Sequence, residues 1–211
     1  MTNEAIADLA RLREIAEEGR RLPLHGGRYL ILWGSAVALA TLLHGAVAAQ
    51  ILPLPPMAIA VIWFGLMIGA WLIAHFGFGR SMKASANDIG NRIERTVWQI
   101  GGGFLGLIAL SIFLSAFITL SQSGNASRFA LFTLMPPIMF GVYAIALRVT
   151  VEAAALPALK PYALIALVFA AITILLAGQL WQFVVSAIGI CIVAIAPGLM
   201  LLRIEAGANH G

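Results

Sequence analysis

Six long stretches of the chain are almost entirely apolar, and short polar segments separate them. An α-helix needs about 20 apolar residues to cross a hydrocarbon core of about 30 Å. None of the stretches alternates between apolar and polar residues, so the strands of a membrane barrel are excluded. The pattern therefore predicts six transmembrane helices, at Tyr29–Ala49, Met57–Phe76, Val97–Leu120, Phe129–Leu147, Tyr162–Gln179 and Phe183–Leu202.

The last two stretches are separated only by residues 180–182. One continuous helix across both would exceed the bilayer thickness about twofold at about 1.5 Å per residue. A tight turn near Gly178 is therefore required. The fold class that follows is an all-α bundle of six transmembrane helices, arranged as three hairpins.

Residues 4–22 form a different pattern, in which apolar residues recur every three or four positions among charged ones. Pro23 and the pair Gly26-Gly27 then interrupt the helix before the first span. We expect a short amphipathic helix on the cytoplasmic face, and a solvated helix that only caps the bundle fits the pattern equally well. The chain thus divides into residues 1–27 (helix and hinge), 28–203 (six-helix membrane domain) and 204–211 (cytoplasmic tail).

Composition supports a membrane protein, since 61% of the 211 residues are hydrophobic and 10% are charged. Soluble domains are about 45–50% apolar and about 25% charged. A soluble enzyme, a disordered tail and a disulfide scaffold are therefore excluded, and Cys191 is the single cysteine. The net charge of +4 comes from basic residues beside apolar stretches, which favours the lipid bilayer over nucleic acid as the partner.

The distribution of basic residues predicts the orientation. Twelve of the 13 lysines and arginines lie in the N-terminal segment, the second and fourth connections and the C-terminal segment, which share one side of the membrane. Arg128 is the exception on the other side. The positive-inside rule then places both chain ends in the cytoplasm.

The spans carry almost no ionisable groups, which argues against an ion-coupled transporter. His44 lies well inside the first span, and no second histidine lies at its depth. A hydrogen bond to a neighbouring helix is therefore favoured over haem or metal ligation. No catalytic constellation is present, so we expect no enzyme activity and no cofactor, although lipid could bind.

Polar residues gather at one depth in the outer half of the spans. Ser111, Ser115 and Thr119 are spaced four residues apart on one helix face. The two prolines of the fourth span free the carbonyls of Phe132 and Thr133, which then need donors. These residues form either a polar vestibule or a set of bonds that joins helices and repairs a kink, and we favour the second. The candidate vestibule comprises Thr41, His44, Ser111, Ser115, Thr119, Thr133, Pro136 and Pro137.

Two glycine pairs, Gly65 with Gly69 and Gly102 with Gly106, have the GxxxG spacing that lets helices approach closely. Glycine and alanine are abundant throughout the chain, so internal packing is favoured over dimerisation. Pro197 predicts a kink near the inner end of the last span.

Residues 20–34 (RRLPLHGGRYLILWG) and 91–98 (NRIERTVW) resemble a group of six-span bacterial inner-membrane proteins with no assigned activity. The resemblance implies a bacterial plasma membrane and transfers no catalytic or ligand residue. Both stretches join an inner-face connection to a span, and they supply a candidate partner surface. Its residues are Arg28, Tyr29, Trp33, Arg92, Glu94, Arg95 and Trp98.

These features lead to one functional hypothesis and two alternatives. The first is a non-enzymatic membrane subunit or adaptor that packs against other membrane proteins, or against a second copy of itself. A passive channel or facilitator for a small neutral solute would use the outer-half polar residues instead. A lipid-handling or signalling component would use the N-terminal helix.

Overall fold

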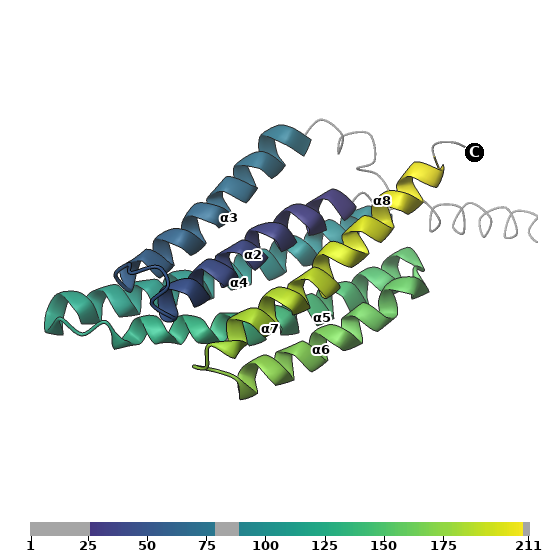
Figure 1. The fold of residues 1–211 in the computed structure, drawn as a ribbon. Coiled ribbons are helices and arrows are strands. Elements are labelled where there is room, and N and C mark those ends of the chain that lie inside the picture. Colours follow the sequence, from purple (N-terminus) through teal and green to yellow (C-terminus); the bar gives the residue numbers. More distant parts are fainter. Residues whose placement is uncertain (1–25, 79–88, 209–211) are drawn as a thin grey trace, which may run out of the picture.

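The computed structural model describes residues 26–78 and 89–208, and every regular element in these ranges is helical (Figure 1). The predicted N-terminal helix over residues 4–22 lies outside the described residues. The elements are α2 (Gly27–Ala48), α3 (Met57–Phe78), α4 (Ile89–Ser123), η2 (Ser127–Leu134), α5 (Met135–Ala154), η3 (Pro157–Leu159), α6 (Lys160–Leu175), α7 (Trp181–Ile190), η4 (Cys191–Ile195) and α8 (Ala196–Ala208).

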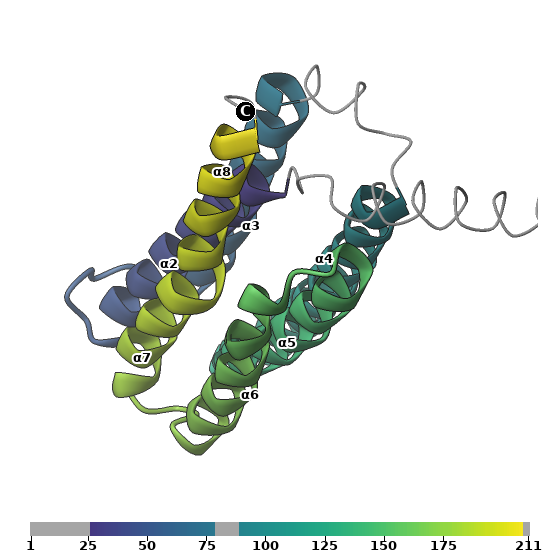
Figure 2. The same cartoon turned by 90° about the vertical axis from the view of Figure 1, so that its right-hand side faces the viewer.

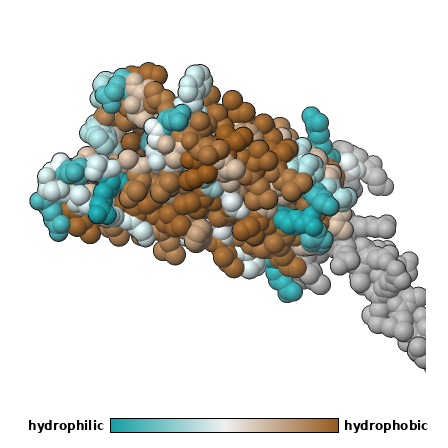
Figure 3. Space-filling model, turned by 90° about the horizontal axis from the view of Figure 1, so that it is seen from below, coloured by the Kyte–Doolittle hydropathy of each residue, from teal (hydrophilic) through white to brown (hydrophobic). Residues whose placement is uncertain are grey.

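Six helical stretches of the described chain are long and apolar enough to cross a membrane, which confirms the predicted number and order. They are Gly27–Ala48, Met57–Phe78, Arg92–Ser123, Ser127–Ala153, Pro157–Leu175 and Trp181–Gly207. The visible face of the molecule is apolar across its middle, and hydrophilic side chains gather toward its two ends (Figure 3). This distribution suits a protein that is surrounded by lipid.

The six spans pack as two groups of three. The first group contains α2, α3 and the continuous α7–η4–α8 rod, and the second contains α4, α5 and α6 (Figure 2). The third hairpin is therefore divided, because α6 packs mainly on α5 while α7 packs mainly on α2. The first and last spans thus lie side by side.

The last span has a π-helical turn beside the proline at which the sequence predicts a kink. Residues Cys191–Ile195 form a π-helical turn directly before Ala196 and Pro197. Proline has no backbone N–H, and its ring crowds the carbonyl four residues earlier, so a wider turn at this place relieves both problems. Cys191 is exposed on this turn rather than packed inside the bundle.

Helix α4 is longer than the sequence indicates, since it runs from Ile89 to Ser123 rather than from Val97 to Leu120. Its 35 residues correspond to about 52 Å, well beyond the hydrocarbon thickness. Part of the predicted inner connection is therefore helical.

Glycines join the first and last spans. A Cβ at Gly27 would lie 2.8 Å from the Gly198 carbonyl oxygen, and one at Gly198 would lie 2.9 Å from the Gly27 carbonyl oxygen. Two turns further along α2, a Cβ at Gly34 would lie 2.9 Å from the Cβ of Ala194. The two backbones consequently touch along this seam, which we call the α2–α8 seam.

The GxxxG glycines do not pack internally, which corrects the interpretation from sequence. A Cβ at Gly65, Gly69, Gly102 or Gly106 would meet nothing within 4 Å. The close helix contacts are made instead by Gly27, Gly34 and Gly198 of the first and last spans.

Candidate functional site

The two adjacent prolines do not kink the middle of an α-helix, as the sequence suggested. Residues Ser127–Leu134 form a 3₁₀ segment, and α5 begins at Met135 with Pro136 in its first turn. This position suits proline, because the first turn of a helix needs no intrahelical donor. The carbonyl of Phe132 accepts the Met135 N–H, which leaves the carbonyl of Thr133 in need of a donor.

Gln182 supplies that donor. Its Nε2 donates to the Thr133 carbonyl oxygen at 2.6 Å and to the Thr173 carbonyl oxygen at 3.0 Å, while its Oε1 accepts the Gly178 N–H at 3.3 Å. Gln182 is fully buried. One side chain therefore ties η2 to α6 and to the α6–α7 turn, in place of the Ser111 and Ser115 donors expected from sequence.

Sequence reasoning treated Gln182 as part of a connection and missed this role. The available signal was chemical: two carbonyls without donors in an apolar bundle require a side chain with two N–H groups, as a glutamine has.

His44 forms the expected hydrogen bond to a neighbouring helix. The indole Nε1–H of Trp63 on α3 donates to His44 Nδ1 at 3.4 Å, and both side chains are buried. The ring of Phe183 on α7 lies against the same imidazole, with centroids 4.4 Å apart.

A pocket of about 350 Å3 opens beside His44, at the end of the bundle that the basic residues predict to be the outer one. Residues of all three outer connections contribute to its wall, together with the ends of the helices that they join. The lining residues are His44, Ala48, Pro56, Ile59, Ala126, Ser127, Phe129, Ala130, Thr133, Gly178, Leu180 and Phe183. We refer to it as the outer pocket.

The candidate vestibule is divided by the structure. His44 and Thr133 line the outer pocket, whereas Ser111 and Ser115 do not. The Ser111 hydroxyl is exposed and donates to the Leu107 carbonyl of its own helix. Ser115 instead accepts a 2.9 Å hydrogen bond from the Arg128 guanidinium.

The remaining residues of the candidate vestibule either hydrogen-bond to the backbone of their own helix or are buried in the core. The Thr119 hydroxyl donates to the Ser115 carbonyl at 2.9 Å. Thr41 is fully buried one turn below His44, and its hydroxyl has no hydrogen-bond partner. Pro136 and Pro137 are buried at the start of α5.

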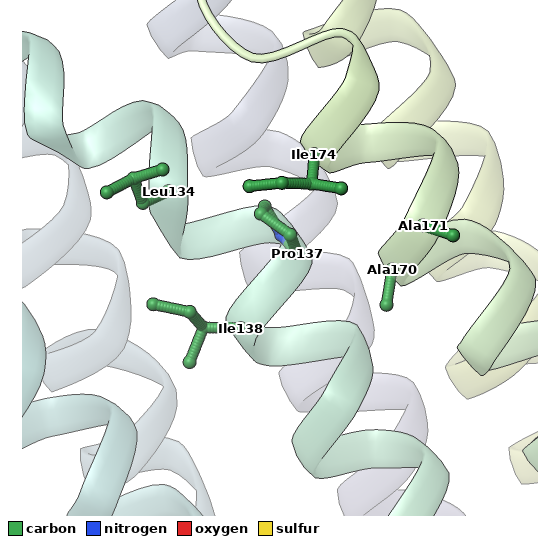
Figure 4. Close-up of a pocket in the computed structure, with 6 residues that line it drawn as sticks. All are labelled: Leu134, Pro137, Ile138, Ala170, Ala171 and Ile174. Carbon is green, nitrogen blue, oxygen red and sulfur yellow. The ribbon is translucent and has the colours of Figure 1, made fainter.

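A second hollow, of about 530 Å3, lies between the beginning of α5 and α6 (Figure 4). Its lining is apolar and consists of Leu134, Pro137, Ile138, Ala170, Ala171 and Ile174. Without a polar side chain it can hold hydrocarbon but cannot orient a ligand, so it is the weaker candidate site.

The candidate partner surface is only partly on the outside. Glu94 is 5% exposed at the inner end of α4, and a side chain at residue 26 would collide with its carboxylate. The Trp98 ring packs edge-on against Tyr143, with centroids 4.9 Å apart. Arg28, Arg92 and Thr96 remain exposed near the same end.

The burial of Glu94 corrects the prediction that it lies in an inner connection as part of a docking surface. Helix α4 already begins before this residue, so its carboxylate is turned against the beginning of α2. The two stretches that carry the resemblance thus contact each other rather than presenting two separate surfaces.

In the described part of the chain, no three His, Cys, Asp or Glu side chains gather in a way that could hold a metal ion. Comparisons with protein-family models, with curated proteins and with solved structures gave no match for this chain.

Proposed function

We propose that this multi-pass membrane protein is a non-enzymatic subunit or adaptor of the bacterial inner membrane, with both chain ends in the cytoplasm. The orientation is supported by the basic residues, which leave Arg128 alone on the outer side. The bacterial membrane is supported by the resemblance of residues 20–34 and 91–98.

The proposal rests on the face of α4 that points away from the other helices, which we call the outer face of α4. Only 6% of the most apolar window of α4 is buried within the molecule, against 22–56% in the other spans. Gly102, Gly103 and Gly106 leave open space on this helix, where any added Cβ would meet nothing within 4 Å. Small residues let a second helix approach closely, so this face suits a protein neighbour in the membrane.

A solute path is less well supported by the geometry. The predicted path needs Ser111 and Ser115 to share one cavity with His44 and Thr133, and they lie apart. The buried rings of Phe129 and Phe183 line the outer pocket.

The test is to extract the protein from its native membrane in a mild detergent and to determine which chains remain with it. We expect the wild-type protein to be recovered with a second copy or with another membrane protein. Gly106→Leu should release that neighbour, because the new side chain fills the outer face of α4 at a position where an added Cβ meets nothing within 4 Å. Light scattering and mass spectrometry of the purified complex measure both results.

Gly65→Leu on α3 is the matched control, since its position is likewise exposed, an added Cβ there meets nothing within 4 Å, and it lies on another helix. It should leave the complex intact. A wild-type protein recovered as a lone monomer, or two variants with the same effect, would contradict the proposal.

A further inference from the structure

The imidazole of His44 has one nitrogen without a protein partner. Its Nδ1 accepts the Trp63 N–H, so the ring proton of the neutral imidazole must lie on Nε2. No described hydrogen bond uses this Nε2–H. Among the described residues, the buried side-chain polar atoms that lack a partner belong to Thr41, Glu94 and Thr150, so the His44 Nε2 itself retains accessible surface. Its side chain lines the outer pocket, where a ligand can accept this N–H.

The walls of the outer pocket favour an uncharged occupant. None of its lining side chains carries a formal charge, and Ile59, Phe129, Leu180 and Phe183 give it a mostly apolar surface. The nearest cation along the chain, Arg128, donates to Ser115 of α4 instead. An anion or a cation would therefore lose its hydration without gaining a counter-charge.

Two other polar side chains lie in the wall: Ser127, which is exposed at the rim, and Thr133, which is already engaged as a donor. The Thr133 hydroxyl donates to the Ala130 carbonyl at 2.7 Å, so only its lone pairs remain for a ligand. Among the buried side chains of the wall, His44 is thus the one that can donate a hydrogen bond to a ligand.

We propose that the outer pocket binds an uncharged, mostly apolar molecule whose carbonyl oxygen accepts the His44 Nε2–H. A volume of about 350 Å3 holds one ring or the glycerol end of a lipid rather than a whole lipid. Two membrane molecules share this chemistry: a quinone, through a ring carbonyl, and an acylglycerol, through an ester carbonyl. The proposal does not depend on the adaptor function, because the outer pocket is built without the outer face of α4.

The experiment uses the full chain in maltoside micelles, since this detergent carries no carbonyl group. Histidine-selective 15N labelling reports on the ring nitrogens, and His44→Gln identifies the His44 signals by their loss. The probes are a decyl-substituted benzoquinone, dioctanoylglycerol and undecane, which lacks a carbonyl. We expect a saturable shift of the His44 Nε2 signal with at least one carbonyl probe and none with undecane.

Three variants separate the hydrogen bond from the shape of the pocket. His44→Phe keeps a ring but removes the donor, and it should weaken binding of the carbonyl probe about fivefold to tenfold. His44→Gln retains an N–H at a similar reach and should restore most of the affinity. Ala130→Phe fills the pocket and should abolish binding while leaving every hydrogen bond of His44 in place.

Binding of the quinone alone assigns a quinone ligand, binding of dioctanoylglycerol alone assigns a lipid ester, and binding of both supports the shared carbonyl chemistry. The proposal is overturned if neither carbonyl probe moves the His44 signal, if undecane moves it equally, or if Ala130→Phe binds as well as the wild type. Because His44→Phe could also disturb folding through Trp63, the wild-type signal and Ala130→Phe decide the outcome without it.

Discussion

At the scale of single residues, the outer end of the bundle depends on one glutamine that donates to two carbonyls without helical donors. Pro137 has no N–H for the Thr133 carbonyl, and the Thr173 carbonyl lies in the last turn of α6, where no helical donor follows. Gln182 Nε2 reaches both oxygens. In an apolar surrounding no water is present to donate to such carbonyls. The Gln182 side chain therefore determines how η2, α6 and the α6–α7 turn pack together.

Replacing Gln182 with leucine keeps the volume roughly constant and removes three hydrogen bonds. We expect Gln182→Leu to lower the free energy of unfolding by about 1–3 kcal/mol, because two buried carbonyls lose their donor. Unfolding in mixed micelles with increasing SDS measures the change. Gln179→Leu, at an exposed position of the same turn, should stay close to the wild type, and equal losses in both variants would count against this role.

At the scale of elements, the glycines of this chain fall into two classes that their spacing does not distinguish. Gly27 and Gly198 lie where two helix backbones touch, whereas Gly102 and Gly106 border open space. The second pair has the GxxxG spacing, yet the first pair, from opposite ends of the chain, makes the tight contact. Sequence spacing describes one helix face, and only tertiary packing decides what that face meets.

A pair of alanine substitutions tests this distinction. Gly198→Ala places a methyl group 2.9 Å from the Gly27 carbonyl oxygen and 2.8 Å from Ile31 Cγ1, so we expect a loss of about 1–3 kcal/mol in stability. Gly106→Ala meets nothing within 4 Å and should be neutral or stabilising by up to about 1 kcal/mol, since alanine favours a helix. Thermal unfolding in micelles compares the two, and a reversed order would disprove the α2–α8 seam.

Features that depend on neighbouring residues could be predicted from the sequence, whereas contacts between distant residues could not. The second span was predicted as Met57–Phe76 and observed as Met57–Phe78, because apolar length is a local property. The Trp63–His44 bond joins two helices, and the outer pocket collects residues of three connections. Such contacts depend on how helices face each other, which hydropathy does not specify.

At the scale of the whole molecule, the contact between the first and last spans holds the first group of helices together. Helix α2 packs on α3 and on the α7–η4–α8 rod, while α4, α5 and α6 form the other group (Figure 2). The connection between α6 and α7 joins the groups at the outer end, where Gln182 and the outer pocket lie. The inner end carries the exposed arginines near the beginnings of α2 and α4. The polar hydrogen-bonding site and the basic residues are therefore at opposite membrane faces.

Because the basic residues lie at one end of the bundle, the orientation that they predict can be tested by chemical labelling. In a Cys191→Ser background, Ser127→Cys puts a thiol at the beginning of η2 and Arg203→Cys puts one near the end of α8, both at exposed positions. Because positively charged ends are retained in the cytoplasm, we expect a membrane-impermeant maleimide to modify Ser127→Cys in intact spheroplasts. Arg203→Cys should react only after lysis. If Arg203→Cys reacts first, or if both react together before lysis, the basic residues do not set the orientation of this bundle.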